Sequence, residues 1–530
     1  MHETFSISDP EIPDGLRRLI LVLGDQLDPL TLDRLDFDPE HDLVAMFEVA
    51  EEATHVPSHK ARTALFLAAM RHHALALAEG PAKDRLLYVC LDDPENRGSF
   101  ASELRRLAER LASEEVTIER LAFVRPGEWR VLDALEDVAS DLKWSIEQIE
   151  DHHFLTDLDA FESWAAGRKE LVMEYFYRWQ RRRLNLLMDG KDPAGGRWNF
   201  DQENRQPLND EAPSPNDPLQ FAPDAITREV LELVNRAFPD APGSTASFGW
   251  PVRRDQALEA LDQFLDDRLC HFGPYQDAMR TGEPWVFHSL LSPALNLKLL
   301  DPREVVDAAV ARWRDGDAPL QSVEGFVRQI VGWREYVRCI YWSQGRGYRQ
   351  RNHLRQNGDL PAAYWGADTD MTCLRESLGQ VFKHGYGHHI QRLMVTGVYA
   401  LMAGAHPKNV SDWYLGMYVD AVDWVTLPNT LGMVMYADGG VLGTKPYVAS
   451  GNYISRMSDY CSHCRFDPKA KTGEDACPFT VLYWDFLRRH RPALEGNRRM
   501  GWVWKNLERI DEETTRGITA RARELRTDSD

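Results

Sequence analysis

The 530-residue chain has only seven cysteines, too few to form the disulfide framework of a secreted domain. It has no run of about 18 apolar residues, so the sequence predicts no membrane-spanning helix. The first residues, MHETFSISDPEIPDG, are polar and lack the apolar centre of a signal peptide. We therefore expect a cytoplasmic protein with two or more domains and a large core.

Positive charge is also scarce, because 62 Lys and Arg residues face 83 Asp and Glu residues, for a formal net charge of −21. This balance argues against broad, non-specific binding of nucleic acid, but it leaves room for a local basic groove. One such concentration is the segment Arg178-Trp-Gln-Arg181-Arg182-Arg183. Its simpler interpretation is the solvated face of a helix.

The first third of the chain alternates between strand-like and helix-like segments. Apolar runs predict buried strands at 17–27, 43–50, 86–92 and 119–126, and helical periodicity lies between them at 59–78 and 99–114. This alternation predicts an α/β domain with a parallel, Rossmann-like sheet. Gly24, Asp25 and Gln26 would end its first strand, at the edge where such sheets bind ligands. The chain lacks Gly-x-Gly-x-x-Gly, so the standard dinucleotide fingerprint is absent.

The rest of the chain is organised differently. Residues from about 190 to 250 are rich in Pro, Asn, Asp and Gly and predict a long irregular connector, whereas nearly every apolar pattern beyond residue 251 is helical. We therefore predict these divisions: a disordered extension (1–17), the α/β domain (18–150), an interdomain connector (151–250), an all-helical domain (251–510) and a C-terminal tail (511–530).

Three cysteines stand close together near the C-terminus, in the pattern Cys461-x2-Cys464-x12-Cys477-Pro478. Thiolates at such spacing favour zinc or an iron–sulfur cluster, and a metal would order a loop that has little apolar surface of its own. A fourth ligand must come from elsewhere, and Cys373 is our choice. His463 between the cysteines keeps zinc open as the alternative.

This layout resembles that of the cryptochrome/photolyase family, and several motifs carry the resemblance from about residue 18 to 490. HSLLSP (288–293) is similar to the stretch that holds the flavin diphosphate, and RQIVGWREY (328–336) to the helix beside the flavin ring. LGDQL, EVAEEATHVPSHK, GGRWNFDQENRQP, HHIQRLMVTG and the cysteine set resemble the iron–sulfur bacterial branch, whose (6-4) photolyases are the nearest match.

The resemblance implies three cofactors. A [4Fe–4S] cluster would bind Cys373, Cys461, Cys464 and Cys477. FAD would contact Tyr275, His288, Ser289, Leu290, Leu291, Ser292, Gln329, Arg334, Arg392, Asp420, Thr426 and Asn429. An antenna, 6,7-dimethyl-8-ribityllumazine, would contact Gly24, Asp25, Gln26, Glu52, His55, Gly127 and Glu128.

It also implies the remaining functional residues. The lesion pocket would contain His389 as proton donor, with His388, Met433, Tyr447 and Tyr453. Electron transfer would use Trp365, Trp413 and Tyr414, although core packing is the commoner explanation of any single tryptophan. DNA phosphates would contact Arg181, Arg182, Arg183 and Lys445, with GGRWNFDQENRQP as a DNA-facing loop.

Two positions depart from the branch. Thr426 stands where relatives place a side chain facing flavin N5, and it offers a hydroxyl but no acid, so Asn429 is the alternative for that position. His55 replaces a tyrosine of the antenna site, which makes loss of the antenna an alternative.

The expected function is light-driven repair of (6-4) photoproducts in UV-damaged DNA by a monomeric enzyme without a membrane partner. A blue-light receptor with little or no repair is the alternative, and repair of cyclobutane dimers is a variant of the first hypothesis. A zinc-bearing, helical DNA-binding protein without flavin is a third interpretation.

Overall fold

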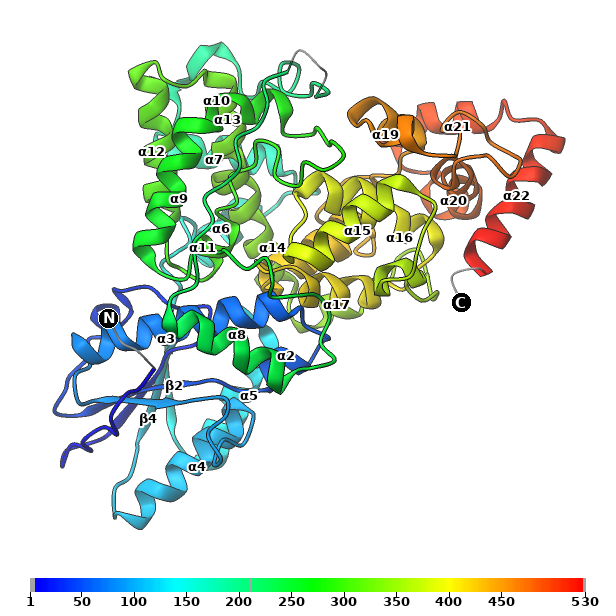
Figure 1. Cartoon of the computed structure of the whole chain (residues 1–530). Coiled ribbons are helices and arrows are strands. Elements are labelled where there is room, and N and C mark those ends of the chain that lie inside the picture. The colour runs from blue at the N-terminus through cyan, green and yellow to red at the C-terminus, as the bar shows by residue number, and fades with distance from the viewer. Residues whose placement is uncertain (1–4, 209–211, 528–530) are drawn as a thin grey trace.

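The computed structural model describes residues 5–208 and 212–527, so parts of the predicted extension, connector and tail lie outside the described residues. The chain forms an α/β domain followed by a larger helical region (Figure 1). The predicted fold class is therefore confirmed. Within the part of the chain that the structure describes, no helix is both long and apolar enough to span a bilayer.

The α/β domain is built on a fully parallel five-stranded sheet in the order β3-β2-β1-β4-β5. Its strands are β1 (Arg18–Leu21), β2 (Asp42–Phe47), β3 (Leu86–Val89), β4 (Arg120–Val124) and β5 (Ser145–Ile149). The four predicted strands are confirmed, whereas β5 is new; it has exposed and half-buried residues, so no apolar run marks it.

Alternate side chains of each strand enter different helical layers. Leu19 and Leu21 pack with α4 (Phe100–Ser113) and α5 (Trp129–Leu142), and Ile20 packs with the opposite layer. That opposite layer contains α3 (Lys60–Glu79) and α8 (Ala225–Ala237), which lie along the same side of the sheet in Figure 1. Burial on both faces explains why the strands are continuous apolar runs.

The connector is more ordered than its composition predicts. It contains α6 (Leu158–Ala165), α7 (Met173–Leu184) and α8. The prediction of irregular structure is wrong for α8, whose N-cap Asp224 accepts a hydrogen bond from the Thr227 amide and whose Ile226, Val230 and Val234 are buried. Tertiary burial of one helix face outweighs the Pro- and Asn-rich flanks.

Both ends of the described chain make defined contacts. Phe5, within the segment predicted to be disordered, packs edge-on against Tyr88 at 4.9 Å between ring centroids, and its amide donates to Glu229. At the other end, α22 (Glu512–Thr527) buries Ile518 against the helical region.

The helical region contains the longer helices α9 (Arg254–Asp267), α12 (Pro302–Asp315), α14 (Glu335–Gln344), α15 (Thr372–His384), α17 (Pro407–Met417) and α20 (Pro478–Leu494). The shorter ones are α10 (Leu269–Tyr275), α11 (Ser292–Asn296), α13 (Leu320–Val327), α16 (Val398–Ala403), α18 (Asp423–Leu427), α19 (Gly451–Met457) and α21 (Gly501–Leu507). The α/β domain adds α1 (Thr31–Arg34) and α2 (Glu51–Thr54), and the connector adds the short hairpin β6 (Met188–Asp189) and β7 (Asp192–Pro193).

Three segments of the helical region are π-helical, namely η2 (Arg328–Arg334), η5 (Gln391–Gly397) and η6 (Pro428–Val434). π-turns are rare and concentrate at functional sites, because the wider turn redirects side chains. All three segments carry residues that the sequence assigns to the flavin or lesion site. They therefore mark the centre of the helical region as the place to look for a site.

Candidate active site and cofactor sites

A buried ion pair lies at the centre of the helical region. Arg392, on η5, donates to both carboxylate oxygens of Asp420 at 2.9 and 3.1 Å. Ser292 donates to the same carboxylate at 2.6 Å, and the Asn296 amide donates to the Asp420 carbonyl at 2.7 Å. A buried pair is tolerated only when its remaining groups are bonded in this way. The fold thus joins α11, η5 and the loop before α18, three predicted flavin-binding segments.

Two histidines with free ring nitrogens lie beside this ion pair. His288 and His388 stack at 4.4 Å with ring planes 12° apart. His288 Nε2 and both ring nitrogens of His388 are buried without a hydrogen-bond partner among the described residues, as are Nε and Nη1 of Arg268. Desolvation, together with nearby positive charge, lowers the pKa of His288 to about 3 and that of His388 well below its usual value. Such orphaned donors fit a bound polar group, so these residues suit a cofactor diphosphate.

The other predicted flavin contacts have local bonds of their own. Gln329 donates to Gly325 O, and Arg334 donates to His153 O and Glu335 while its guanidinium lies 4.1 Å from the Phe154 ring centroid. The remaining ones, Tyr275, Ser289, Leu290, Leu291, Thr426 and Asn429, are buried or half-buried in the helical region. Leu290 has φ of 58°, so the backbone of HSLLSP turns sharply there.

His389 differs from its neighbour His388 because it is open to solvent. The surrounding protein partly desolvates the ring, and this desolvation, together with the positive charge of Arg392, lowers the pKa of His389 to about 4. In the free protein the imidazole is therefore neutral at pH 7, contrary to the simple expectation of an imidazolium. An anion bound nearby, such as a DNA phosphate, would raise this pKa towards the range that a general acid needs.

The other predicted lesion-pocket residues come from η6, from the segment before α19 and from α19 itself. Met433 is buried, while Tyr447 and Tyr453 are half-buried. Burial raises the pKa of both tyrosines, although Arg499 and Arg205 act in the opposite direction on Tyr447. Both phenols therefore stay protonated at neutral pH and present polar-edged aromatic rings.

An unbroken series of aromatic contacts leads from the ion pair towards the surface. The Arg392 guanidinium lies 3.9 Å from the Tyr418 ring centroid, and Tyr414 and Trp413 follow at 5.2 and 5.5 Å between successive rings. Tyr364 is 5.2 Å from Trp413 and precedes Trp365, which is 52% exposed. The rings of Trp413 and Tyr414, both predicted to transfer electrons, are therefore in contact. The same series contains Tyr418 and Tyr364, which sequence reasoning missed.

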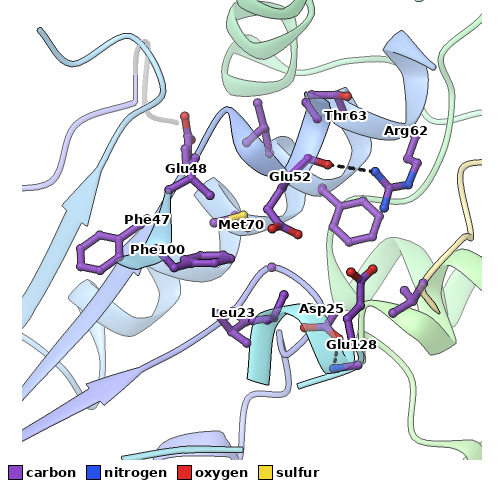
Figure 2. Close-up of a pocket in the computed structure, with 18 of the residues that line it drawn as sticks. Leu23, Asp25, Phe47, Glu48, Glu52, Arg62, Thr63, Met70, Phe100 and Glu128 are labelled. Atoms are coloured by element: carbon purple, nitrogen blue, oxygen red, sulfur yellow. Dashed lines mark hydrogen bonds between the residues drawn. The ribbon is translucent and has the colours of Figure 1, made fainter. Parts of the chain in front are cut away.

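A pocket opens at the carboxyl edge of the parallel sheet, where the strand order reverses between β1 and β4 (Figure 2). It holds about 760 Å³ of space, part of which is open to solvent, a size that suits a small organic ligand. We call it the sheet-edge pocket. Five of the seven predicted antenna residues line it: Gly24, Asp25, Glu52, Gly127 and Glu128.

The other two predicted antenna residues have different surroundings. Gln26 is buried and donates to Val124 O at 2.9 Å, which ties the ends of β1 and β4 together. His55 Nδ1 donates to Glu51 O at 3.0 Å, and its Nε2 is buried without a partner in the described structure. Sequence reasoning missed the apolar lining, to which Phe47, Phe66, Met70, Phe100 and Val422 contribute. These residues looked like ordinary core positions.

Gly127 is required by close packing at the mouth of the sheet-edge pocket. A Cβ at this position would lie 2.5 Å from Asp25 Oδ2 and 2.6 Å from Val422. The Gly127 amide donates to that carboxylate, and the Gly127 carbonyl accepts from the Trp424 amide at 3.1 Å. Val422 is the N-cap of α18 and Trp424 lies in its first turn, and the loop before this helix carries Asp420. The sheet-edge pocket and the ion pair are thus separated by one short segment of chain.

Asp25 is expected to destabilise the folded protein at neutral pH. Burial, with only Lys298 in opposition, raises its pKa from 3.8 to about 6. The folded state therefore binds this proton more tightly than the unfolded chain. The free energy that ionised Asp25 costs the folded state increases as the pH rises from 4 through 6. We expect Asp25→Asn to raise the free energy of unfolding by about 2 kcal/mol at pH 8 and to change it little at pH 4.

Denaturant unfolding at both pH values measures this effect. Asp14→Asn, which removes an exposed carboxylate from the segment just before β1, serves as the control. Equal effects of Asp25→Asn at pH 4 and pH 8 would contradict the titration argument.

The four predicted cluster ligands line one cavity. Cys373 comes from the first turn of α15, Cys461 and Cys464 from the segment after α19, and Cys477 caps α20. The cavity holds about 300 Å³ of space, part of which is open to solvent, and Gly451 packs so closely that a Cβ there would lie 2.9 Å from Cys477 Sγ. Burial and the neighbouring sulfurs raise the pKa of Cys373 well above its usual value and that of Cys461 to about 11.

The arrangement bears on the alternative of a single zinc ion. Across the residues described, no three His, Cys, Asp or Glu side chains converge as the ligands of one metal ion would. His463 is exposed and does not line the cavity. Four thiols and no histidine therefore line this cavity.

The structure corrects the predicted DNA contact of Arg181. This side chain is fully buried, and its guanidinium donates to the carbonyl oxygens of Leu186, Leu187 and Trp198. It therefore fixes the connector and is inaccessible to phosphate. Arg182 is exposed and lies over the Trp198 ring, and Arg183 is exposed but bonded to Gln180 and Leu155 O; Lys445 is exposed.

The α/β sheet with its edge pocket, the buried Arg–Asp pair of the helical region and the four-cysteine cavity are three separate candidate sites in one chain. Comparison with known proteins shows the family of the chain. A model of the family described as "Deoxyribodipyrimidine photo-lyase-related protein" matches residues 20–250. The chain is 46% identical to a protein named (6-4) photolyase from Agrobacterium fabrum, over 96% of this chain and 98% of that protein.

Solved structures agree in fold. A bacterial class III photolyase from Agrobacterium tumefaciens matches with a TM-score of 0.54 and 15% identity, over 97% of this chain and 99% of that one. A cryptochrome from Synechocystis matches with a TM-score of 0.50 and 12% identity over the same shares. The chain belongs to the cryptochrome/photolyase family.

Proposed function

We propose that this protein repairs (6-4) photoproducts in UV-damaged DNA in a light-driven reaction. The observation that carries the proposal is the 46% identity, along nearly the whole chain, to a protein named (6-4) photolyase. The central site also supports it, because the fold brings together the Arg392–Asp420 ion pair, the stacked His288 and His388, and His389. We place the activity in the bacterial cytoplasm, with the protein at the nucleoid when it binds DNA, and we propose that it acts as a monomer.

FAD fits the polar groups at the centre of the helical region. His288, His388 and Arg268 present unbonded, buried nitrogens to a diphosphate, and Arg392 provides a positive charge for the flavin ring. When bound and reduced, FAD would supply an electron to the lesion upon excitation by blue light. Asp420 holds the guanidinium in place, and Ser292 and Asn296 hold Asp420.

The lesion would be held and protonated by residues of the solvent-open pocket. Tyr447 and Tyr453 present ring faces and hydroxyl groups on which extruded bases could stack. His389 would donate a proton as the hydroxyl group returns from one base to the other, and the phosphates of the bound DNA would raise its pKa from about 4. Exclusion of water by the bound DNA would strengthen both effects.

We also propose a [4Fe–4S] cluster on Cys373, Cys461, Cys464 and Cys477, and a lumazine antenna in the sheet-edge pocket. The single cavity bordered by the four sulfurs supports the first. The size of the sheet-edge pocket and its separation from Asp420 by one short segment support the second. His55 does not line that pocket, so its replacement of a tyrosine argues less strongly against the antenna than the sequence suggests.

A blue-light receptor remains the second candidate, because Thr426 offers no acid near the flavin site and lies on α18 beside the domain contact. A repair assay separates the two. Reduced, cofactor-loaded protein is incubated with oligonucleotides that carry one (6-4) or one cyclobutane lesion, in blue light and in darkness. Light-dependent loss of the (6-4) lesion supports the enzyme; repair of neither lesion would exclude it, and repair of the cyclobutane lesion alone would change its substrate.

A further inference from the structure

A single exposed tryptophan stands out on the surface of the helical region. Trp502 on α21 is 78% exposed, the largest exposed fraction of any large apolar or aromatic side chain described. Trp504 and Leu507 of the same helix are buried and anchor it to the core. The helix is therefore firmly placed, yet it presents an indole to solvent, where a tryptophan gains nothing for folding.

Positive charge surrounds this tryptophan. Arg498, Arg499 and Lys505 are exposed, and the Lys505 ammonium lies 5.7 Å from the Trp502 ring centroid. We call Arg498, Arg499, Trp502 and Lys505 the α21 patch. The nearby carboxylates of Glu495 and Glu508 both pair with Arg491 instead. None of the three cations of the patch forms an ion pair with another described residue, so their charge is available to an anionic partner.

The α21 patch is continuous with the proposed lesion pocket. Arg499 donates to the Thr444 hydroxyl, and the Asn497 amide just before it donates to Thr444 O at 2.9 Å. Thr444 precedes Lys445, and the charge of Arg499 acts on Tyr447. Figure 1 shows α21 and α19, the helix that carries Tyr453, on the same side of the helical region.

We propose that the α21 patch is a second DNA-binding surface, occupied by the duplex that flanks the lesion. Its cations would bind backbone phosphates, and Trp502 would stack on a base left without a neighbour where the damaged nucleotides leave the helix. The combination of unpaired cations with one flat, exposed ring matches the chemistry of partly unstacked DNA. This inference rests on the proposed function.

Binding of a fluorescent lesion-bearing duplex tests the phosphate contacts. We expect Arg498→Ala/Lys505→Ala to weaken binding and to reduce the slope of log K against log[salt] by about 2, because two phosphate contacts are lost. The control Arg17→Ala/Lys83→Ala removes the same charges from exposed, unpaired side chains of the α/β domain, and it should leave the slope unchanged. Equal slopes for the two double variants would overturn the proposal.

Trp502 variants test the stacking. We expect Trp502→Ala to weaken binding of the lesion duplex about tenfold and Trp502→Phe to recover most of the loss, since a flat ring suffices for stacking. Because the Trp502 side chain is exposed, its substitution should leave the unfolding temperature unchanged. Measuring that temperature checks that the variants are folded. If Trp502→Ala binds lesion DNA normally and instead abolishes a concentration-dependent dimer, the patch is a contact between copies of the chain and the proposal is wrong.

Repair activity separates this inference from the proposed function. If the wild-type protein repairs the lesion in light and every α21 variant binds DNA normally, the α21 patch is not a DNA-binding surface. The proposed repair activity then stands. Absence of repair of either lesion by the cofactor-loaded wild-type protein overturns the enzyme itself. At saturating protein concentration the α21 variants should repair at the wild-type rate, because the patch contributes to binding only.

Discussion

His389→Ala should lower the rate of (6-4) repair by about 10²- to 10⁴-fold, the usual contribution of a positioned general acid. His389 is exposed, whereas its neighbour His388 is buried. The free ring nitrogens of His288 and His388 are buried, so they cannot reach a lesion in the solvent-open pocket. The measurement is single-turnover repair of a lesion-bearing oligonucleotide under constant blue light.

His384→Ala is the matched control. Its pKa is also lowered to about 4, mainly by burial, but its ring packs 4.9 Å from Trp285, away from the lesion pocket. This variant should repair at nearly the wild-type rate. Comparable losses in both variants would mean that His389 acts through folding alone.

The pH dependence of lesion binding adds a readout that a structural effect would not change. If DNA phosphates raise the pKa of His389 above its free value of about 4, binding takes up a proton. The affinity of the wild-type protein for lesion DNA should then increase as the pH falls from 8 to 6. The His389→Ala variant should lose this dependence.

Cys477→Ser should remove the metal from the protein and destabilise the region after α19. Cys477 caps α20 and borders the same cavity as Cys373, Cys461 and Cys464, which come from two other stretches of chain. A metal group there would join these stretches, so its free energy of binding becomes free energy of folding. Iron content per chain and protection from proteolysis around residues 458–477 are the measurements; we expect iron to fall to near zero.

Cys270→Ser is the control for this substitution. Cys270 is half-buried on α10, and its thiol donates to Asp317 O, a bond that a serine hydroxyl can replace. Iron content should be unchanged in this variant. Full iron in Cys477→Ser would contradict a four-cysteine cluster, and stoichiometric zinc in the wild-type protein would contradict iron altogether.

The match between sequence and structure varies with the kind of residue. The three clustered cysteines and Gly24-Asp25 were accessible to reasoning because their spacing or their position after a strand carries the signal. Arg181 was misassigned, since a basic run looks alike whether its side chains are solvated or bonded to carbonyl groups. Tyr418 and Tyr364 were missed because only their ring contacts, and no local pattern, connect them with Trp413.

By itself the sequence determined the parallel sheet, the helical second half and the group of three thiols, because periodicity and spacing are local properties of a chain. Only the tertiary structure decided that Ser292 and Asn296 hold the Asp420 of the Arg392 ion pair and that the four cysteines border one cavity. It also decided that His389 is open while His388 is enclosed. The physical reason is that burial, desolvation and pairing depend on neighbours distant in the chain, which local periodicity does not encode.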